Sequence, residues 1–459
     1  MIDHSLPNKT PLERFLNLFT EVRSGEALSA LMLALNIYLI LTAYYVLKPV
    51  REALILAGGG AEIKSYAAAG QAMLLLLAVP FYGWLASRVS RRLLINGVTL
   101  FFAACLLLFY FLAQIDTPLG VVFFLWVGIF NLMVPAQFWA FANDIYTPDE
   151  GERLFVIVAF GASLGAVSGS YLDHLLIQSL GVYQMMLVAA GILVFSLLIT
   201  NFLQTSGRAS HDSLPAKDKA PASANKEEEP LKQGGSFAMV FNNRYLLLIA
   251  LLMLLLNWVN TTGEYILGRT VLENANQLLA DNPDYPLTKE QIIGEFYAGF
   301  FTVVNIAGLV LQLFVVSRIL KFFGVRVALM ILPLIALGGY IVAAFYPVLA
   351  YVRWVKTAEN ATDYSLQNTV RQVLFLPTTR EQKYKAKQAI DTFFVRAGDV
   401  LSAVLVFAGT TWLALSTQGF AMVNILLVCF WLIIALLIGK HYRRLVPHDA
   451  DESSRKTET

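Results

Sequence analysis

Residues 38–56 read YLILTAYYVLKPVREALIL. It starts as an ordinary apolar membrane span and then carries Lys48, Arg51 and Glu52. Because Lys48 and Arg51 are three residues apart, a helix places both on one face, one turn above the other. Pro49 removes a backbone donor between them and should kink or loosen the helix. A charge near the bilayer centre costs roughly 2.5–3.5 kcal/mol, so it is rarely without a function.

Two interpretations of these cations are open. In the first, Lys48 and Arg51 line a water-filled cavity and bind an anionic group there. In the second, both side chains lie at the rim of the membrane and snorkel to the headgroups, because residues 53–57 continue the apolar stretch only briefly. Only the first interpretation predicts a binding site.

The composition is that of a polytopic membrane protein. Of 459 residues, 57% are hydrophobic and 14% are charged, against about 25% charged in soluble domains. No basic domain or nucleic-acid-reading module is present, so nucleic acid is not an expected partner. The sequence contains no GxxxxGK[ST] loop and no HExxH. We therefore expect no enzyme activity, no cofactor and no metal, and we expect the partners to be the lipid bilayer and a small molecule.

Apolar runs of about 20 residues, the length that crosses a bilayer, recur along the chain. Six precede a polar stretch, at 27–56, 66–86, 93–113, 119–143, 154–177 and 182–203, and six follow it, at 243–267, 292–316, 325–346, 347–376, 389–412 and 418–439. The sequence predicts an all-α membrane protein with about twelve spans. The predicted parts are an amphipathic cytoplasmic segment (1–25, with a helix at 9–23), two six-helix bundles (26–203 and 241–440), a disordered linker (204–240) and a cytoplasmic tail (441–459).

The loop charges predict the orientation. Alternate loops are rich in Arg and Lys, for example Arg88, Arg91 and Arg92, and the opposite loops are mainly acidic. The residues that we place in this opposite set are Glu62, Asp116, Asp173, Asp281, Asp284, Glu290 and Glu295, with Lys64 and Lys289 as its cations. By the positive-inside rule, both termini are cytoplasmic.

Two six-helix halves joined by a polar linker resemble the layout of the major facilitator fold. The loop GWLASRVSRR from Gly83 is similar to the signature between the second and third helices of that superfamily. The match is partial, because Ser87 stands where the signature usually has Asp and Ser90 where it has Gly. In this fold the substrate site lies between the halves near the midplane of the membrane.

The charges left inside the spans form the candidate site. Lys356, Glu359, Asn360 and Asp363 follow i, i+3, i+4, i+7 spacing and form one polar helix face over two turns. This face either lines a central cavity or forms a self-neutralising ladder of ion pairs that holds the halves together. The predicted substrate-binding residues are Lys48, Arg51, Glu264, Arg269, Lys356, Asp363, Arg371, Arg396 and Asp399.

The fifth predicted span carries Gly161, Gly165 and Gly169 at four-residue spacing. Small residues at this spacing let two membrane helices approach closely. We therefore interpret them as a packing face and not as a nucleotide-binding loop.

Three stretches resemble the ATP/ADP translocases of plastids and obligate intracellular bacteria. They are DYSLQNTVRQVLFLPTTREQKYKAKQAID at 363–391, QFWAFANDIYTPDEGERLFVIVAFGASLG at 137–165, and YYVLKPVRE at 44–52. The resemblance implies nucleotide exchange, with intramembrane cations holding the phosphates. Arg51 then corresponds to a first-helix Lys implicated in transport, and Glu264 to a seventh-helix acid.

The departures from this family are at charged positions. Asp399 stands where the family has a phosphate-binding Lys, and Asp363 also replaces a Lys. Phosphate oxygens require several cationic donors. The nearly balanced set of charges therefore suits a substrate with one or two negative charges, or a zwitterion, better than ATP.

The favoured hypothesis is a secondary transporter in the inner membrane of a bacterium that moves an organic anion, with nucleotides among the candidates. Lys48 and Arg51 would hold the anion, Arg371 and Arg396 would line the opposite half, and the acids would couple protons or bind the other end of a zwitterion. The first alternative is a proton-driven exporter of another small metabolite, such as a siderophore. The second is a membrane scaffold that does not transport.

Overall fold

A computed structural model describes residues 10–17, 20–23, 25–205, 235–379 and 381–445. All regular elements in these ranges are helical, which confirms the all-α prediction. The α-helices are α1 (Pro11–Leu16), α2 (Ala27–Ala86), α3 (Arg91–Ala113), α4 (Gly120–Ile145), α5 (Pro148–Leu180), α6 (Gln184–Thr205), α7 (Ser236–Asn242), α8 (Arg244–Asp281), α9 (Lys289–Val310), α10 (Val316–Phe345), α11 (Leu349–Thr362), α12 (Asn368–Val373), α13 (Lys387–Ala389), α14 (Val395–Thr411) and α15 (Thr417–Leu445). Most of the predicted linker and tail lies outside the described residues.

Nine helices in the described ranges are long and apolar enough to cross a membrane. Two of these segments, at Ala27–Ala86 and Lys289–Phe345, have 60 and 57 residues. A straight helix of 60 residues would be about 90 Å long, far more than the ~30 Å hydrocarbon core. Each of the two therefore supplies two crossings. With the interrupted helix at 349–373, the described chain provides the twelve predicted spans.

The two long segments contain a glycine with positive φ where one crossing ends and the next begins. Gly60 has φ 80° and Gly324 has φ 71°, and both have extended ψ values. The prediction of a loop at residues 57–65 is wrong, because α2 continues through this region apart from Gly60. The gap between the predicted spans 27–56 and 66–86 suggested a loop, but only Gly60 leaves the helical conformation.

π-Helical stretches interrupt the second part of the chain. They are η2 (Leu311–Val315), η3 (Asp363–Gln367), η4 (Gln382–Ala386) and η5 (Ile390–Phe394). π-Helical turns are rare and occur frequently at functional sites. Residues 363–394, which carry part of the resemblance to the translocases, contain three of them.

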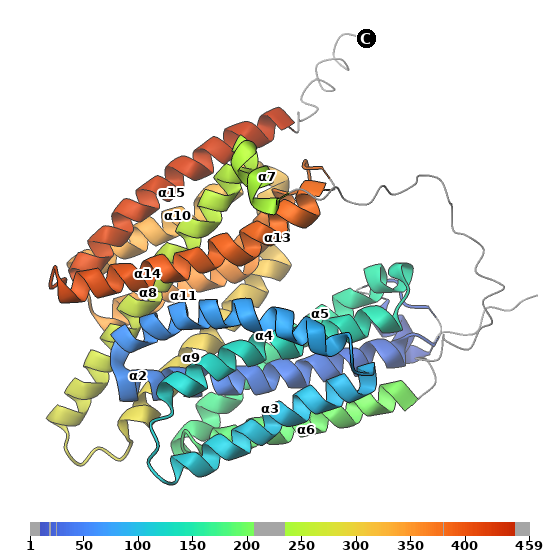
Figure 1. Cartoon of the computed structure of the whole chain (residues 1–459), viewed down its shortest axis with the longest axis horizontal. Helices are drawn as coiled ribbons and strands as arrows, with labels where there is room; N and C mark the ends of the chain where they lie inside the picture. The colour runs from blue at the N-terminus through green and yellow to red at the C-terminus, as the bar shows by residue number, and fades with distance from the viewer. Residues whose placement is uncertain (1–9, 18–19, 24, 206–234, 380, 446–459) are drawn as a thin grey trace, which may run out of the picture. The chain divides into compact units, whose positions relative to one another are not determined.

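The contacts divide the chain into two compact units. Unit 1 comprises residues 1–59, 73–227 and 275–305, and unit 2 comprises residues 60–72, 228–274 and 306–459. Within unit 1, α3 and α6 run side by side, and within unit 2, α10 and α15 do the same (Figure 1). Residues 60–72 of the predicted first bundle belong to unit 2, and residues 275–305 of the predicted second bundle belong to unit 1. The predicted domain boundaries therefore stay a prediction.

The glycine face of α5 packs against α2 in unit 1. A Cβ atom at Gly161, Gly165 or Gly169 would collide with the backbone carbonyl of Ala34, Tyr38 or Thr42, respectively. Both sets of residues advance by four, which shows that the two helices run together over two turns. The packing interpretation of the glycine spacing is confirmed.

The predicted amphipathic helix at 9–23 is shorter than expected. α1 ends at Leu16, and the Asn17 side chain accepts a hydrogen bond from the Val22 backbone N–H at 2.8 Å, which closes a turn there. Leu16 and Val22 pack with Leu154 of α5 in a small apolar cluster. The segment therefore folds against the start of α5.

Candidate functional site

Lys356 forms the centre of a buried ion network in unit 2. Its side chain on α11 is 1% exposed, and its Nζ lies 3.1 Å from Glu359 Oε1 and 3.6 Å from Glu264 Oε1. The ammonium also donates to Asn260 Oδ1 at 2.9 Å. Glu264 and Asn260 are on α8, so the network joins two helices that are distant in sequence. Two predicted site residues, Glu264 and Lys356, are thus in contact.

Three further side chains complete this network. Lys64 of α2 lies 3.8 Å from Glu264 Oε2, Asn360 donates to Glu264 Oε1 at 3.1 Å, and the Tyr340 hydroxyl of α10 donates to Glu359 Oε2 at 3.0 Å. Two lysines and two glutamates give a formal charge of zero. A buried set of charges is tolerated when it is paired and hydrogen-bonded, as here.

Sequence reasoning missed Lys64. We placed Lys64 and Glu62 in a loop, and this is wrong, because both are helical residues of α2 just after the bend at Gly60. Lys64 is 7% exposed inside α2, and Glu62 accepts a hydrogen bond from the Tyr265 hydroxyl at 2.9 Å. The sequence feature that could have indicated a continuous helix is the apolar stretch that resumes directly after Lys64.

Asp399 belongs to a second polar cluster in unit 2. Its Oδ1 accepts hydrogen bonds from Asn257 at 2.7 Å and Thr261 at 2.8 Å, and its Oδ2 lies 3.2 Å from Arg396. A Cβ at Gly398 would collide with the backbone of α8, so α14 and α8 are closely packed here. Asp399 therefore ties α14 to α8.

Arg269 lies in a separate group on α8. Its guanidinium contacts Glu273 at 3.0 Å, the Tyr265 hydroxyl at 3.3 Å and the Leu415 carbonyl at 3.2 Å. Its nearest charged partner within the described ranges is on its own helix. The structure thus gives Arg269 a role in fastening α8 to the loop before α15.

Arg371 and Asp363 flank the π-helical turn η3. Arg371 donates to Asn368 at 2.9 Å, and its Nε is buried without a hydrogen-bond partner among the described residues. Asp363 is the first residue of η3 and is half-buried, and no ion pair joins it to another described residue. The predicted polar face thus extends from Lys356 to Asn360, and Asp363 stands apart from the ladder.

Lys48 is buried in unit 1, and Arg51 is partly buried there, with 14% of its side chain exposed. Lys48 is 8% exposed, with its Nζ 3.9 Å from the centre of the Phe301 ring. Arg51 pairs with the adjacent Glu52, and its guanidinium lies 4.7 Å from the centre of the Phe124 ring. Cations over aromatic faces gain about 0.5–2 kcal/mol, the more so when desolvated. The burial favours the interior interpretation over snorkelling at the membrane rim.

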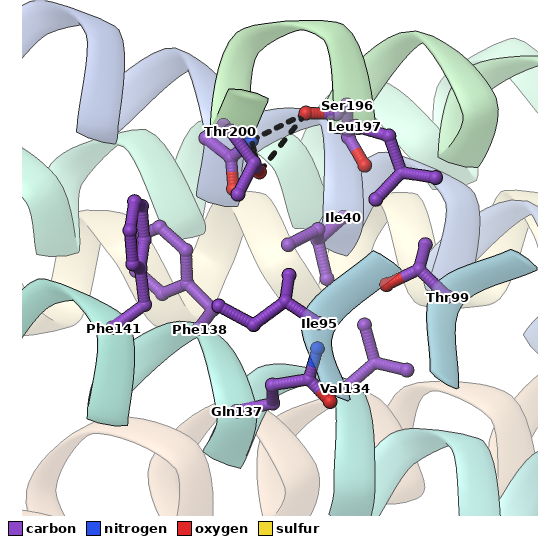
Figure 2. Close-up of a pocket in the computed structure, with 11 residues that line it drawn as sticks. Ile40, Ile95, Thr99, Val134, Gln137, Phe138, Phe141, Ser196, Leu197 and Thr200 are labelled. Carbon is purple, nitrogen blue, oxygen red and sulfur yellow. Dashed lines mark hydrogen bonds between the residues drawn. The ribbon is translucent and has the colours of Figure 1, made fainter. Parts of the chain in front are cut away.

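A small pocket lies inside unit 1, among α2, α3, α4 and α6. Figure 2 shows Thr99, Gln137, Ser196 and Thr200 among its lining residues. Asn36 donates to the Ser196 carbonyl at 2.7 Å and to the Thr200 hydroxyl at 2.8 Å. The space suits about one water molecule and is far too small for a drug-sized ligand. It is a polar packing site within one unit.

Comparisons with known proteins agree with this architecture. The family model of the Major Facilitator Superfamily matches residues 27–357. The solved structure of the nucleoside transporter NupG superposes with a TM-score of 0.60 at 13% identity, covering 90% of this chain and 99% of that one. A bacterial homologue of the lysosomal transporter Spinster, in its inward-facing and unoccupied conformation, superposes with a TM-score of 0.55 at 13% identity, covering 95% and 99%. These likenesses show the fold.

Curated relatives share low sequence identity with the chain. ADP,ATP carrier protein 1 of Chlamydia pneumoniae is 21% identical over 68% of this chain, and the alignment spans 64% of that carrier, which is less than two thirds. ADP,ATP carrier protein 2 of the same organism is 21% identical over 87% of this chain and 86% of the carrier. The expected resemblance to the ATP/ADP translocases is confirmed. The chain belongs to the Major Facilitator Superfamily, as a multi-pass membrane transporter that is a divergent relative of the ADP,ATP carriers.

Proposed function

We propose that the chain exchanges an organic anion across a bacterial inner membrane by alternating access, and that ATP and ADP are the first substrates to test. The single observation that carries this proposal is the placement of two cations, the buried Lys48 and the partly buried Arg51, inside the first membrane helix. The resemblance to the translocases implies first-helix cations at these two positions. Intramembrane cations of this kind mark substrate pathways.

The aromatic rings beside these cations also support a substrate with an aromatic group. Phe301 and Tyr45 lie 3.9 and 5.2 Å from Lys48 Nζ, measured to the ring centres. Base–aromatic stacking contributes about 1–3 kcal/mol per base, and charge-assisted hydrogen bonds about 1.5–3 kcal/mol each. A phosphate held by the cations and a base stacked on a ring would together fit a nucleotide.

The charge pairing in unit 2 argues for a modest substrate charge. Lys356, Arg396 and Arg269 each lie within 3.2 Å of a carboxylate oxygen. A phosphate must compete with these carboxylates for its donors. We therefore propose that, among nucleotides, the less charged ones bind better, with ADP ahead of ATP.

The test is counter-exchange in proteoliposomes that contain the full chain. Labelled ATP is supplied outside, and the vesicles contain ADP, AMP or buffer. The proposal expects uptake that depends on internal nucleotide. Uptake that is the same with buffer inside, or its absence from a folded preparation, contradicts nucleotide exchange and directs the search to smaller anions.

The neutral network around Lys356 favours a second candidate, a membrane scaffold on a transporter fold. A degenerate site would keep charges that stabilise the helices and bind no substrate. Exchanging Lys356 and Glu359 for one another separates the two functions. A stable but inactive swapped protein supports a site that substrate uses, whereas unchanged cellular function supports a purely structural network.

We also propose that both termini are cytoplasmic, since the loops rich in Arg and Lys lie on the same predicted side as the termini. A single cysteine introduced at Arg92, in a protein whose native cysteines have been removed, tests this. It should react with a membrane-impermeant thiol reagent only after the cells are opened. Labelling in intact cells would reverse the orientation.

A further inference from the structure

Asp173 is a fully buried acid whose carboxylate has no hydrogen-bonding partner among the described residues. Its side chain is 0% exposed, and neither carboxylate oxygen is hydrogen-bonded in the part of the chain that the structure describes. We grouped Asp173 with the charges of the acidic loops, although the predicted span at 154–177 contains it. The structure places it inside α5, which continues to Leu180. The residue therefore lies inside a segment that is long and apolar enough to cross the bilayer.

Asp173 continues the packed face of α5. One turn before it, a Cβ at Gly169 would collide with the backbone of Thr42 and with Tyr45 Cβ on α2. One turn after it, Ile177 packs on Gly294 of α9, at a point where Ala53 of α2 is also close. Because residues four apart share a helix face, Asp173 faces the seam between α2 and α9, all within unit 1.

The seam is polar at this level. Ser170, one turn away on α5, accepts a hydrogen bond from Asn305 of α9 at 3.0 Å. Lys48 of α2 lies over Phe301 of α9, and neither Asp173 oxygen accepts a hydrogen bond from a described residue. The titratable groups on the packed elements near this level are Tyr45 and Lys48 on α2, Glu295 and Tyr297 on α9, and Tyr171 and His174 on α5 itself.

Burying an isolated ionised carboxylate is far more costly than burying a neutral acid, because nothing replaces its hydration. Such intramembrane acids commonly serve proton relays. We propose that Asp173 is a proton-binding site, protonated in this conformation and deprotonated to water when the seam of α2, α5 and α9 opens. This proposal rests on the proposed function, since alternating access supplies the opening, and it makes transport sensitive to protons.

The decisive test reads the acid directly and needs no substrate. The infrared spectrum of the purified full chain is recorded at neutral pH in H2O and D2O, for the wild type and for Asp173→Asn. The carbonyl band of a protonated carboxyl shifts on deuteration, and we expect Asp173→Asn to lose one such band. If the substitution instead removes carboxylate absorption, Asp173 is ionised and the proposal is overturned.

The matched control is Asp399→Asn, because the carboxylate of Asp399 has three donors around it. This variant should keep the protonated band that Asp173→Asn loses. If Asp173→Asn does not fold, the wild type labelled with carboxyl-13C aspartate replaces it. The proposal is supported if the 13C label shifts a protonated carboxyl band that the Asp399→Asn variant also retains. It is overturned if no protonated carboxyl band shifts with the label.

Transport then tests the coupling. In the nucleotide-exchange assay, the wild-type rate should change with external pH, and the rate of Asp173→Asn should not. A pH response that survives in Asp173→Asn overturns the coupling. If no nucleotide is exchanged at all, the proposed substrate fails, while the infrared result still decides whether Asp173 binds a proton.

Discussion

Replacing Lys356 by Met should destabilise the protein strongly. The substitution keeps the length of the side chain but removes the charge that lies 3.1 Å from Glu359 and 3.6 Å from Glu264. At an effective dielectric constant of about 20, each contact is a gross attraction of about 5 kcal/mol. The desolvation of the buried ammonium offsets much of this. The net loss on removing one partner of a buried pair is about 3–5 kcal/mol, since Glu359 is left uncompensated, whereas Glu264 keeps Lys64 as a partner.

The assay is the thermal stability of the purified protein in detergent. Lys356→Met should lower the midpoint by several degrees, and Lys440→Met, at an exposed position of α15, should leave it unchanged. Adding Glu359→Gln to Lys356→Met should recover part of the loss, because it removes the uncompensated acid. A single variant as stable as the wild type, or a double variant no better than the single one, would refute this account of the network.

Three more predictions concern packing and charge. Arg153 donates hydrogen bonds that hold the pKa of Glu26 below its usual range. This pair therefore stabilises the fold above the pKa of an unfolded Glu and stops doing so as pH falls through the lowered pKa. In thermal melts, Glu26→Gln should lower stability at pH 7 and leave it unchanged well below pH 4. Gly165→Ala should cost about 1–3 kcal/mol by overpacking, whereas Gly191→Ala, with open space at its Cβ, should not change the melting midpoint. Asp399→Lys introduces the lysine that the resemblance to the translocases implies, but it places a cation among donors. It should therefore lower stability in the same assay and not improve nucleotide exchange; a gain in exchange would contradict this role.

The span pattern and the glycine face could be predicted because both depend on local spacing. Apolar length alone indicates a crossing, and small residues every four positions indicate close helix packing. Gly161, Gly165 and Gly169 accordingly meet α2 as expected. The pairing of Lys356 with Glu359 also follows from their i, i+3 spacing on one helix.

The parts that could not be predicted depend on where helices end and on contacts between distant segments. Lys64 and Asp173 lie near the ends of apolar runs. A charged residue at such a position is equally compatible with the start of a loop and with a helix that continues. The helices instead continue past both residues and bury them. The two donors to Asp399 Oδ1 come from α8, more than a hundred residues earlier, and no local pattern indicates them.

The central claim, that the first-helix cations bind a transported anion, is tested most directly by exchange in Arg51 variants. Uptake of labelled ATP into vesicles loaded with ADP is compared for the wild type, Arg51→Lys, Arg51→Ala and the exposed control Arg92→Ala. The loss of one charge-assisted contact of about 1.5–3 kcal/mol corresponds to a drop in exchange of about 10- to 100-fold for Arg51→Ala, with Arg51→Lys partly active and Arg92→Ala unchanged. Equal exchange by Arg51→Ala and the wild type, at equal protein content, would contradict the account.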